Sequence, residues 1–369
     1  MDNWLVLGPH TAIYVYRLRA ALGCPLLPIL HGPVLPCACH RMRDVRTRDL
    51  GRILDFSSFD LTKNGLELDL REDGVSYWQS PAFSVMPDGR CRFTQVPEII
   101  VTMDKHRPCT PRLRSFVWSR PLPDGAFLAL PGNVALPRPE LVLHMLASHG
   151  GTPLHVLAGL MSLACSGIGL LPNGIRVSES KYGFVRRPSL SSRATFAQWC
   201  DLQGETRGSA SLRRALCHAV DTAESPQEIA TQLMFGLPLR YGGLGHRSVL
   251  VNHQVNLTEL GRSLCGKSAC RIDVYLEDER FGLENQGVFD HYLTSGQAID
   301  DDNRKKALAQ LGITLEFIKH GDLANEDLVL DIDRRAWSAC DKRPPTPTSR
   351  QRKLRARVWS DLCSPSFLR

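Results

Sequence analysis

Arg271-Ile-Asp273-Val-Tyr-Leu276 is followed by a short turn and then by Phe281-Gly-Leu-Glu284-Asn-Gln286. Each apolar run has the length of a strand and carries one carboxylate, and ten residues lie between Asp273 and Glu284. That spacing suits a hairpin that brings both carboxylates to one place. Two converging carboxylates are typical ligands of Mg²⁺ or Mn²⁺, which prefer oxygen donors. The alternative is a surface hairpin with ordinary solvated acids.

Capped helices flank these strands in the order expected of an α/β fold. Upstream, a helix starts with Ser225 as the N-cap, a proline at its first position and Glu228 completing a capping box. Downstream, residues 300–312 predict a second helix with an acidic start and a terminal glycine. We therefore expect a three-layer α/β core over about residues 210–330, with a mixed sheet between helices. The predicted strands are 251–257, 271–276, 281–286 and 313–318.

This part of the chain resembles the very-short-patch-repair endonuclease-like branch of the PD-(D/E)XK superfamily. The resemblance implies a restriction-endonuclease-like core that hydrolyses DNA phosphodiesters with Mg²⁺ or Mn²⁺. Asp273 and Glu284 match the two metal-binding acids. Gln286 stands where the superfamily has a lysine that orients the attacking water. Glu228 matches an acid in the opening helix, where it would hold a metal-bound water or a second ion, although a purely capping role is the alternative.

Three further residues match positions that contact phosphate or stabilise developing charge in that branch. Gln254 lies on a predicted strand, His291 follows the second acid, and Arg304 lies in an Asp-x-x-Arg-x-x-x-Leu helix. Each also has a structural interpretation: His291 as a helix-entry residue and Arg304 as a solvated helix residue. Gln286 carries no charge, so a nuclease fold without turnover is the alternative to an active enzyme.

The first two hundred residues predict an α+β region with a second resemblance. A strand near Val96–Met103, a basic loop from Lys105 to Arg114, two more strands and a helix entered through Pro137 follow one another. This order resembles the middle domain of abortive-infection antitoxins of the AbiEi class, which implies a regulator with a toxin partner. The predicted helix at 11–22 carries only two arginines and is no convincing DNA-recognition helix.

These patterns divide the chain into four regions. They are an α+β region at 1–95, an antitoxin-like middle domain at 96–205, the nuclease-like domain at 206–335 and a basic, proline-rich tail at 341–369. Lys and Arg number 45 against 38 Asp and Glu, an excess that is compatible with a DNA partner. The prolines and clustered charges of the tail predict a segment that packs poorly on the core.

The sequence predicts a cytoplasmic protein with no membrane partner. Its start lacks the basic region and apolar core of a signal peptide. The longest uncharged run, Gly151 to Pro172, is interpreted as a buried helix over 154–165, because no basic flanks support insertion. The twelve cysteines should then stay reduced. Cys37-Ala-Cys39-His40 lacks the paired knuckles of a zinc site and is expected to be metal-free.

Three functions remain open at this point. The first is a Mg²⁺-dependent DNA endonuclease, and the second is a non-enzymatic, antitoxin-like DNA-binding regulator that kept the nuclease fold. The third is a protein-interaction scaffold. Metal-dependent nicking distinguishes the first from the second, and salt-dependent DNA binding without metal distinguishes the second from the third.

Overall fold

The described part of the chain is mixed α/β, as the sequence predicts. Within it, helices alternate with parallel and antiparallel strand pairs. His291, the Cys37/Cys39/His40 cluster and most of the predicted basic loop before Arg114 lie outside it. The structure, a computed structural model, describes residues 5–21, 26–31, 66–68, 83–85, 91–93, 98–103, 114–130, 134–171, 175–177, 183–286, 295–319 and 321–363.

Two compact units make up the chain, and neither is continuous in sequence. Helix α4 (Leu154–Cys165), whose bounds the sequence predicts, interrupts the first unit and packs against α7 (Pro226–Gly236) in the second. The predicted regions 1–95 and 96–205 both fall largely in the first unit, so the structure does not separate them. The units are Met1–Thr152 with Gly167–Arg214, and Pro153–Ser166 with Ala215–Arg369.

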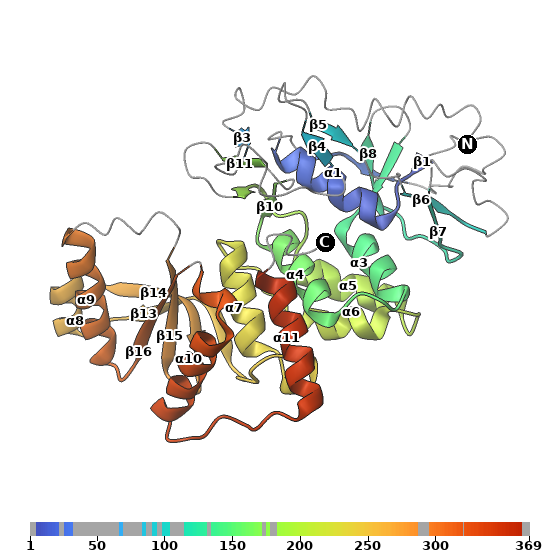
Figure 1. Ribbon diagram of the computed structural model, residues 1–369. Coiled ribbons are helices and arrows are strands. Elements are labelled where there is room, and N and C mark those ends of the chain that lie inside the picture. Colours follow the sequence, from blue (N-terminus) through green and yellow to red (C-terminus); the bar gives the residue numbers. More distant parts are fainter. Residues whose placement is uncertain are drawn as a thin grey trace. The chain divides into compact units, whose positions relative to one another are not determined.

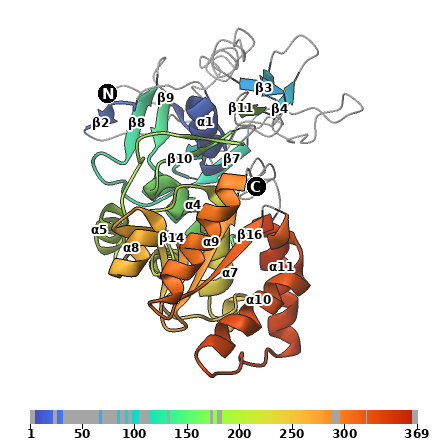
Figure 2. The same ribbon diagram turned by 90° about the vertical axis from the view of Figure 1, so that its left-hand side faces the viewer.

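The first unit is built around a four-stranded sheet in the order β1-β9-β8-β2. β1 is parallel to β9, whereas β8 is antiparallel to both of its neighbours. Helix α1 packs against β9, β10 and α3, and Figure 2 shows it beside this sheet. The elements are β1 (Leu5–Val6), α1 (Pro9–Ala21), β2 (Ile29–Leu30), β3 (Leu66–Leu68), β4 (Phe83–Val85), β5 (Cys91–Phe93), β6 (Glu98–Val101), β7 (Arg114–Val117), β8 (Phe127–Leu130), β9 (Val134–Pro137), α3 (Pro139–Ser148), β10 (Ile168–Leu170), β11 (Ile175–Val177), β12 (Phe184–Arg186), α5 (Arg193–Gln203) and α6 (Ser209–Leu216), which reaches the unit boundary.

His144 is a buried titratable residue at the helical end of the first unit. Its Nδ1 accepts a hydrogen bond from the indole nitrogen of Trp199 at 3.2 Å, and its Nε2 lies 3.1 Å from the carbonyl oxygen of Arg207. Burial lowers the pKa of His144 to about 4, so the ring is neutral at pH 7. Because both ring nitrogens are occupied, His144 serves packing rather than proton transfer.

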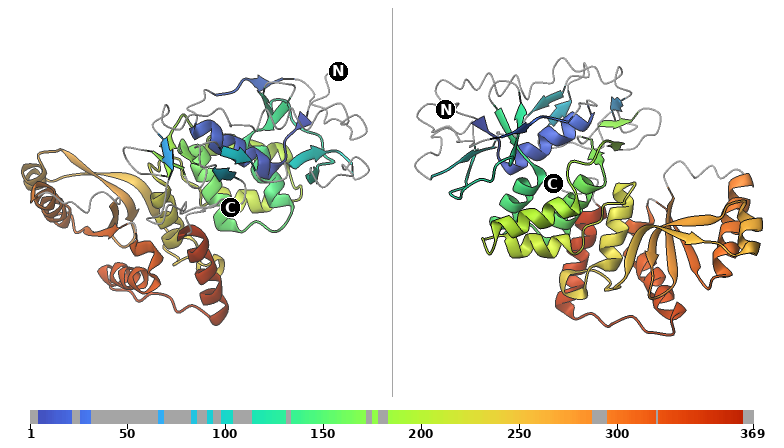
Figure 3. Two further views of the ribbon diagram at one scale, coloured as in Figure 1. Left: turned by 45° about the horizontal axis from the view of Figure 1, so that its top comes forward. Right: turned by 180° about the vertical axis from the view of Figure 1, so that it is seen from behind.

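The second unit has three layers. Neighbouring strands of its sheet, β13-β14-β15-β16, pair antiparallel, antiparallel and parallel. Helices α8 and α9 cover one face, and α7 and α10 lie on the other (Figures 1 and 3). Ala307 and Leu308 of α9 are buried against Ile272 and Leu315 of the sheet. The four predicted strands are confirmed. The elements are α7 (Pro226–Gly236), the 3-10 turn η4 (Leu239–Tyr241), β13 (Val249–Asn256), α8 (Glu259–Cys265), β14 (Ala269–Leu276), β15 (Phe281–Gln286), α9 (Ser295–Ala309), β16 (Thr314–Lys319), the 3-10 turn η6 (Asp322–Ala324), α10 (Glu326–Ala339) and α11 (Ser349–Cys363).

The basic C-terminal segment packs onto the second unit, and the prediction that it packs poorly is wrong. Helix α11 begins after the prolines and buries Val358, Trp359 and Leu362. The indole nitrogen of Trp359 donates to the carbonyl oxygen of Leu323 at 2.9 Å. The prediction gave weight to the charges and prolines, whereas these three apolar residues recur at the spacing of one helix face.

A buried histidine joins α10 to the rest of the second unit. His246 Nε2 lies 2.8 Å from Asp333 of α10, and its Nδ1 lies 3.1 Å from Glu279 in the turn after β14. The ring also stacks on Trp337, with 4.7 Å between ring centroids. Burial lowers the pKa of His246, but the two carboxylates outweigh it, so the net shift is upward. This buried cluster therefore joins α10, the turn after β14 and the segment before β13.

Candidate active site

The candidate site lies where β14 and β15 separate. Their ladder ends at the pair Val274–Leu283, and side chains replace the backbone acceptors beyond it. The backbone N–H of Asn285 donates to Asp273 Oδ2 at 2.9 Å, and the N–H of Asp273 donates to Glu284 Oε1 at 3.3 Å. Each carboxylate therefore satisfies a backbone donor at the end of the hairpin ladder. The two predicted metal ligands are thus brought together.

A break between β13 and β14 helps to place Asp273. The ladder continues on either side of Asn252 and Asp273 but skips this pair. Asn252 has a φ of 53°, in the left-handed region that few residues other than glycine, asparagine and aspartate adopt. Beyond the break, Ile272 shares a core face with Tyr275, although residues three apart on a regular strand point to opposite faces. The pleat therefore shifts at Asp273, a feature that the apolar pattern did not reveal.

Glu228 is fixed at the start of α7 by several hydrogen bonds. The Ser225 hydroxyl accepts from the Glu228 backbone N–H at 3.2 Å and donates to Glu228 Oε1 at 3.0 Å, which confirms the predicted cap. The other carboxylate oxygen accepts from the Glu224 backbone N–H at 2.7 Å and from the Asn252 side chain at 2.6 Å. Glu228 is therefore both a capping residue and an oriented acid beside Asp273.

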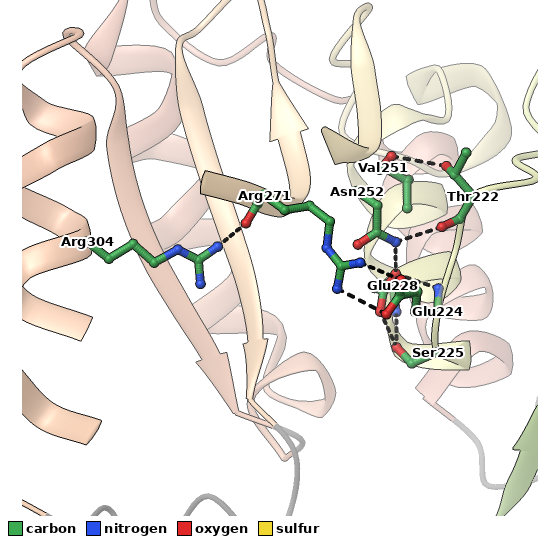
Figure 4. A network of polar contacts seen from close by, with 8 residues as sticks. All are labelled: Thr222, Glu224, Ser225, Glu228, Val251, Asn252, Arg271 and Arg304. Atoms are coloured by element: carbon green, nitrogen blue, oxygen red, sulfur yellow. Dashed lines mark hydrogen bonds and ion pairs between the residues drawn. The ribbon is translucent and has the colours of Figure 1, made fainter. Parts of the chain in front are cut away.

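Two arginines compensate the acids. Arg304 of α9 donates to both oxygens of Glu284, at 2.6 and 2.8 Å, and also to the backbone carbonyl oxygen of Arg271. Arg271 in turn forms a two-pronged ion pair with Glu224, one arm of which is 3.0 Å long. Figure 4 shows Arg271 between Arg304 on one side and Glu224 with Glu228 on the other. The predicted phosphate contact Arg304 is thus bound to an acid of the site.

Burial raises the pKa of all three candidate acids, Glu228, Asp273 and Glu284. The charge of Asp273 raises the pKa of Glu228 and of Glu284 further, which reflects how close the three groups lie. For Glu284 the pKa reaches about 8, because burial and Asp273 outweigh the opposing effect of Arg304. Holding these carboxylates together without a cation between them therefore costs stability.

The two predicted glutamines lie at different distances from the acids. Gln286 follows Glu284 by two residues on β15 and shares its face of the sheet, and its amide donates to Asp301 of α9 at 3.2 Å. Gln254 is exposed on β13, directly across from Arg271 in the ladder. Gln286 therefore belongs to the site, whereas Gln254 lies at its margin.

The donor set fits a hard divalent cation in its chemistry. Within the described ranges, no cluster of three or more His, Cys, Asp and Glu side chains is arranged to hold a metal ion. Mg²⁺, however, needs only one or two carboxylates from the protein and keeps several waters. Asp273 and Glu284 therefore supply the number and type of ligands that a Mg²⁺ site requires. Among the residues that the structure describes, the buried atoms Asn252 Oδ1 and Asn285 Nδ2 of this site have no hydrogen-bond partner.

Sequence reasoning missed three residues of the site: Glu224, Asn252 and Arg271. Arg271 is an exposed charge in a strand whose other residues are apolar except for Asp273, a signal that was present in the sequence. Glu224 directly precedes the N-cap residue Ser225, but nothing in the sequence indicates that it forms an ion pair with Arg271. Asn252 is followed on β13 by His253 and Gln254, so its polarity does not single it out in the sequence, and its side chain makes a tertiary contact with Glu228 that no local pattern encodes.

No family model matches the chain, and neither a curated protein nor a solved structure shows detectable similarity to it. Across the residues that the structure describes, no helix combines the length and the apolar character needed to cross a bilayer.

Proposed function

We propose that the second unit is a metal-dependent DNA endonuclease of the very-short-patch-repair-like PD-(D/E)XK type. The observation that carries the proposal is the meeting of Asp273 and Glu284 at the end of the β14–β15 ladder. The order of elements, from α7 through three antiparallel strands and α9 to the parallel strand β16, supports it. Buried acids with raised pKa values in one cluster are also typical of catalytic sites.

Each residue has a role in this proposal. Asp273, Glu284 and the backbone carbonyl of Asn285 would hold Mg²⁺ or Mn²⁺, which supplies Lewis acidity at the phosphate and an activated water. The fixed carboxylate of Glu228 would orient a water of that cation. The Gln286 amide, on the same face as Glu284, would position the attacking water, and Arg304 would stabilise charge on the phosphate.

A basic face on α11 supports DNA as the substrate. Arg350, Lys353 and Arg357 are exposed and follow one another at the spacing of a single helix face. Like charges at this spacing repel one another, and a phosphate backbone would relieve that repulsion. The chain as a whole carries a formal net charge of +7, which has the same sign.

A second candidate function is an inactive nuclease fold that acts as an antitoxin-like DNA-binding regulator. Two observations favour it: Gln286 brings no positive charge to the site, and both oxygens of Glu284 are engaged by Arg304. In this case the protein would bind DNA without cutting it. The antitoxin-like order of elements in the first unit would supply the toxin contact.

Cleavage of supercoiled plasmid by the purified full chain tests the proposal. We expect nicking with Mg²⁺ or Mn²⁺, none with EDTA, and a loss of at least about a hundredfold in Asp273→Ala, because this variant loses a metal ligand. Asp331→Ala, which removes a half-exposed acid of α10 outside the site, is the matched control and should cut like the wild type. A wild-type protein that is inert with both metals, yet binds DNA as tightly as Asp273→Ala, supports the regulator instead.

A further inference from the structure

We propose that Arg304 and Arg271 form a phosphate-binding pair that Glu284 and Glu224 mask in the free protein. A divalent cation at Asp273 and Glu284 would unmask this pair, so that cation and DNA phosphate bind cooperatively. The inference rests on the proposed function, because it assumes that the site takes both a cation and a phosphodiester.

The first observation is that Arg304 occupies the carboxylate that a cation needs. Its two terminal nitrogens lie 2.8 and 2.6 Å from the two oxygens of Glu284. The Glu284 side chain is only 9% exposed, so no outer face of this carboxylate remains for a second cation. A divalent ion and the guanidinium therefore compete for one group, and coordination of Glu284 must loosen its pair with Arg304.

The second observation is that the two arginines are neighbours. Arg304 donates to the backbone carbonyl of Arg271, whose own side chain reaches Glu224 (Figure 4). The Arg271–Glu224 pair is about half exposed, at 51% and 41%, so its exchange for another anion costs little. The planar fork of each guanidinium matches a phosphate as well as it matches a carboxylate.

The third observation is the charge of the cluster. Glu224, Glu228, Asp273 and Glu284 face two guanidinium groups, so the acids outnumber the cations and an excess of negative charge remains even while Glu284 keeps its proton. This excess repels a phosphate. One divalent cation cancels the excess and at the same time releases arginine donors, so electrostatics and geometry couple the two ligands in the same direction.

DNA binding with and without a cation tests the inference. A labelled 12-base-pair duplex would be titrated with the full chain in EDTA and in Ca²⁺, by fluorescence anisotropy. We expect Ca²⁺ to tighten wild-type binding about tenfold or more, within the usual range of coupling. Arg304→Gln should lose most of the gain in Ca²⁺, so that the ratio of its affinities in Ca²⁺ and in EDTA falls towards one, because the arginine that the cation would release is absent. Arg271→Gln, a half-exposed position with little risk to folding, should lose part of the gain.

The control is Arg335→Gln, since Arg335 of α10 also pairs with acids but lies outside the cluster. It should keep the full effect of Ca²⁺. If Arg304→Gln weakens DNA binding equally in EDTA and in Ca²⁺, Arg304 is an ordinary phosphate contact and the inference is overturned. The inference is also overturned if Ca²⁺ tightens DNA binding by Arg304→Gln as much as it does for the wild type. If the wild type cuts DNA with Mg²⁺ but shows no Ca²⁺ effect, only the inference fails. If it neither cuts nor responds to Ca²⁺, the proposed function fails as well.

Discussion

Glu284 is the residue in which the demands of folding and of the site conflict. Its carboxylate is buried beside Asp273, which raises its pKa to about 8, and it is held by Arg304. An isolated buried carboxylate would simply take up a proton. The arginine stabilises the charged form, and a divalent cation would do so more strongly, so the proton, the guanidinium and a metal ion compete for one group.

This competition predicts how stability depends on pH. An unfolded glutamate loses its proton near pH 4.5, whereas folded Glu284 keeps it up to about pH 8. Raising the pH from 5 to 8 should therefore lower the free energy of unfolding, by roughly a few kcal/mol from this group at most. In Glu284→Gln, which cannot ionise, that part of the slope should vanish in denaturant titrations. The exposed Glu277→Gln should keep the wild-type slope, and equal slopes in all three proteins would refute the assignment.

Gln286 offers a second test at this scale. Replacement by lysine puts a cation on the Glu284 face, within reach of Asp301, at the position to which the proposed nuclease function assigns a lysine. The rate of Mg²⁺-dependent cleavage should stay equal or rise. Gln254→Lys adds the same charge at the exposed margin and reports any general gain in DNA binding. A loss of cleavage in Gln286→Lys alone would show that Gln286 does not hold the proposed position.

The sequence allowed us to predict several residues of the candidate site, but not which residues they contact. Asp273 and Glu284 stand out as acids in apolar strands, and Ser225 with Glu228 has the pattern of a cap. The pairing of Arg304 with Glu284 joins residues twenty positions apart across two elements, and no local pattern encodes it.

At the scale of elements, apolar runs and caps predicted the four strands β13 to β16 and the helices α7 and α9 to within about five residues, but helices α8 and α10 were not predicted. The sequence did not predict the break at Asn252, because a left-handed residue inside a strand needs a tertiary contact to hold it. The prediction of a poorly packed tail also failed at α11, because it gave more weight to the charges and prolines than to the apolar residues Val358, Trp359 and Leu362, which pack on the second unit.

The packing of α11 gives a prediction for stability. Trp359 is 4% exposed and bonded to the carbonyl of Leu323. Trp359→Ala should lower the free energy of unfolding by about 3–5 kcal/mol, the usual cost of removing a buried aromatic side chain. Arg352→Ala, on the exposed side of the same helix, should change it by less than about 0.5 kcal/mol. Urea unfolding of both variants checks this, and similar small changes in both would mean that α11 is not docked in solution.

At the scale of the whole chain, the second unit includes helix α4, which comes from the first half of the sequence. α4 packs on α7; the Ser162 hydroxyl accepts from the backbone of Val220 at 3.0 Å, and His155 lies 2.8 Å from Asp361 of α11. The predicted domain 206–335 therefore lacks both α4 and α11. Sequence patterns mark where elements begin and end, but membership of a packed unit depends on long-range contacts that they do not contain.

The most direct measurement for the central claim is a crystal structure of the full chain grown with Mn²⁺ and a short DNA duplex, with anomalous diffraction used to locate the metal. The account predicts a Mn²⁺ peak between the carboxylates of Asp273 and Glu284, at about 2.0–2.2 Å from an oxygen of each, with Arg304 moved from Glu284 to a phosphate. Bound DNA with no Mn²⁺ peak at these two acids, and with Arg304 still on Glu284, would contradict it.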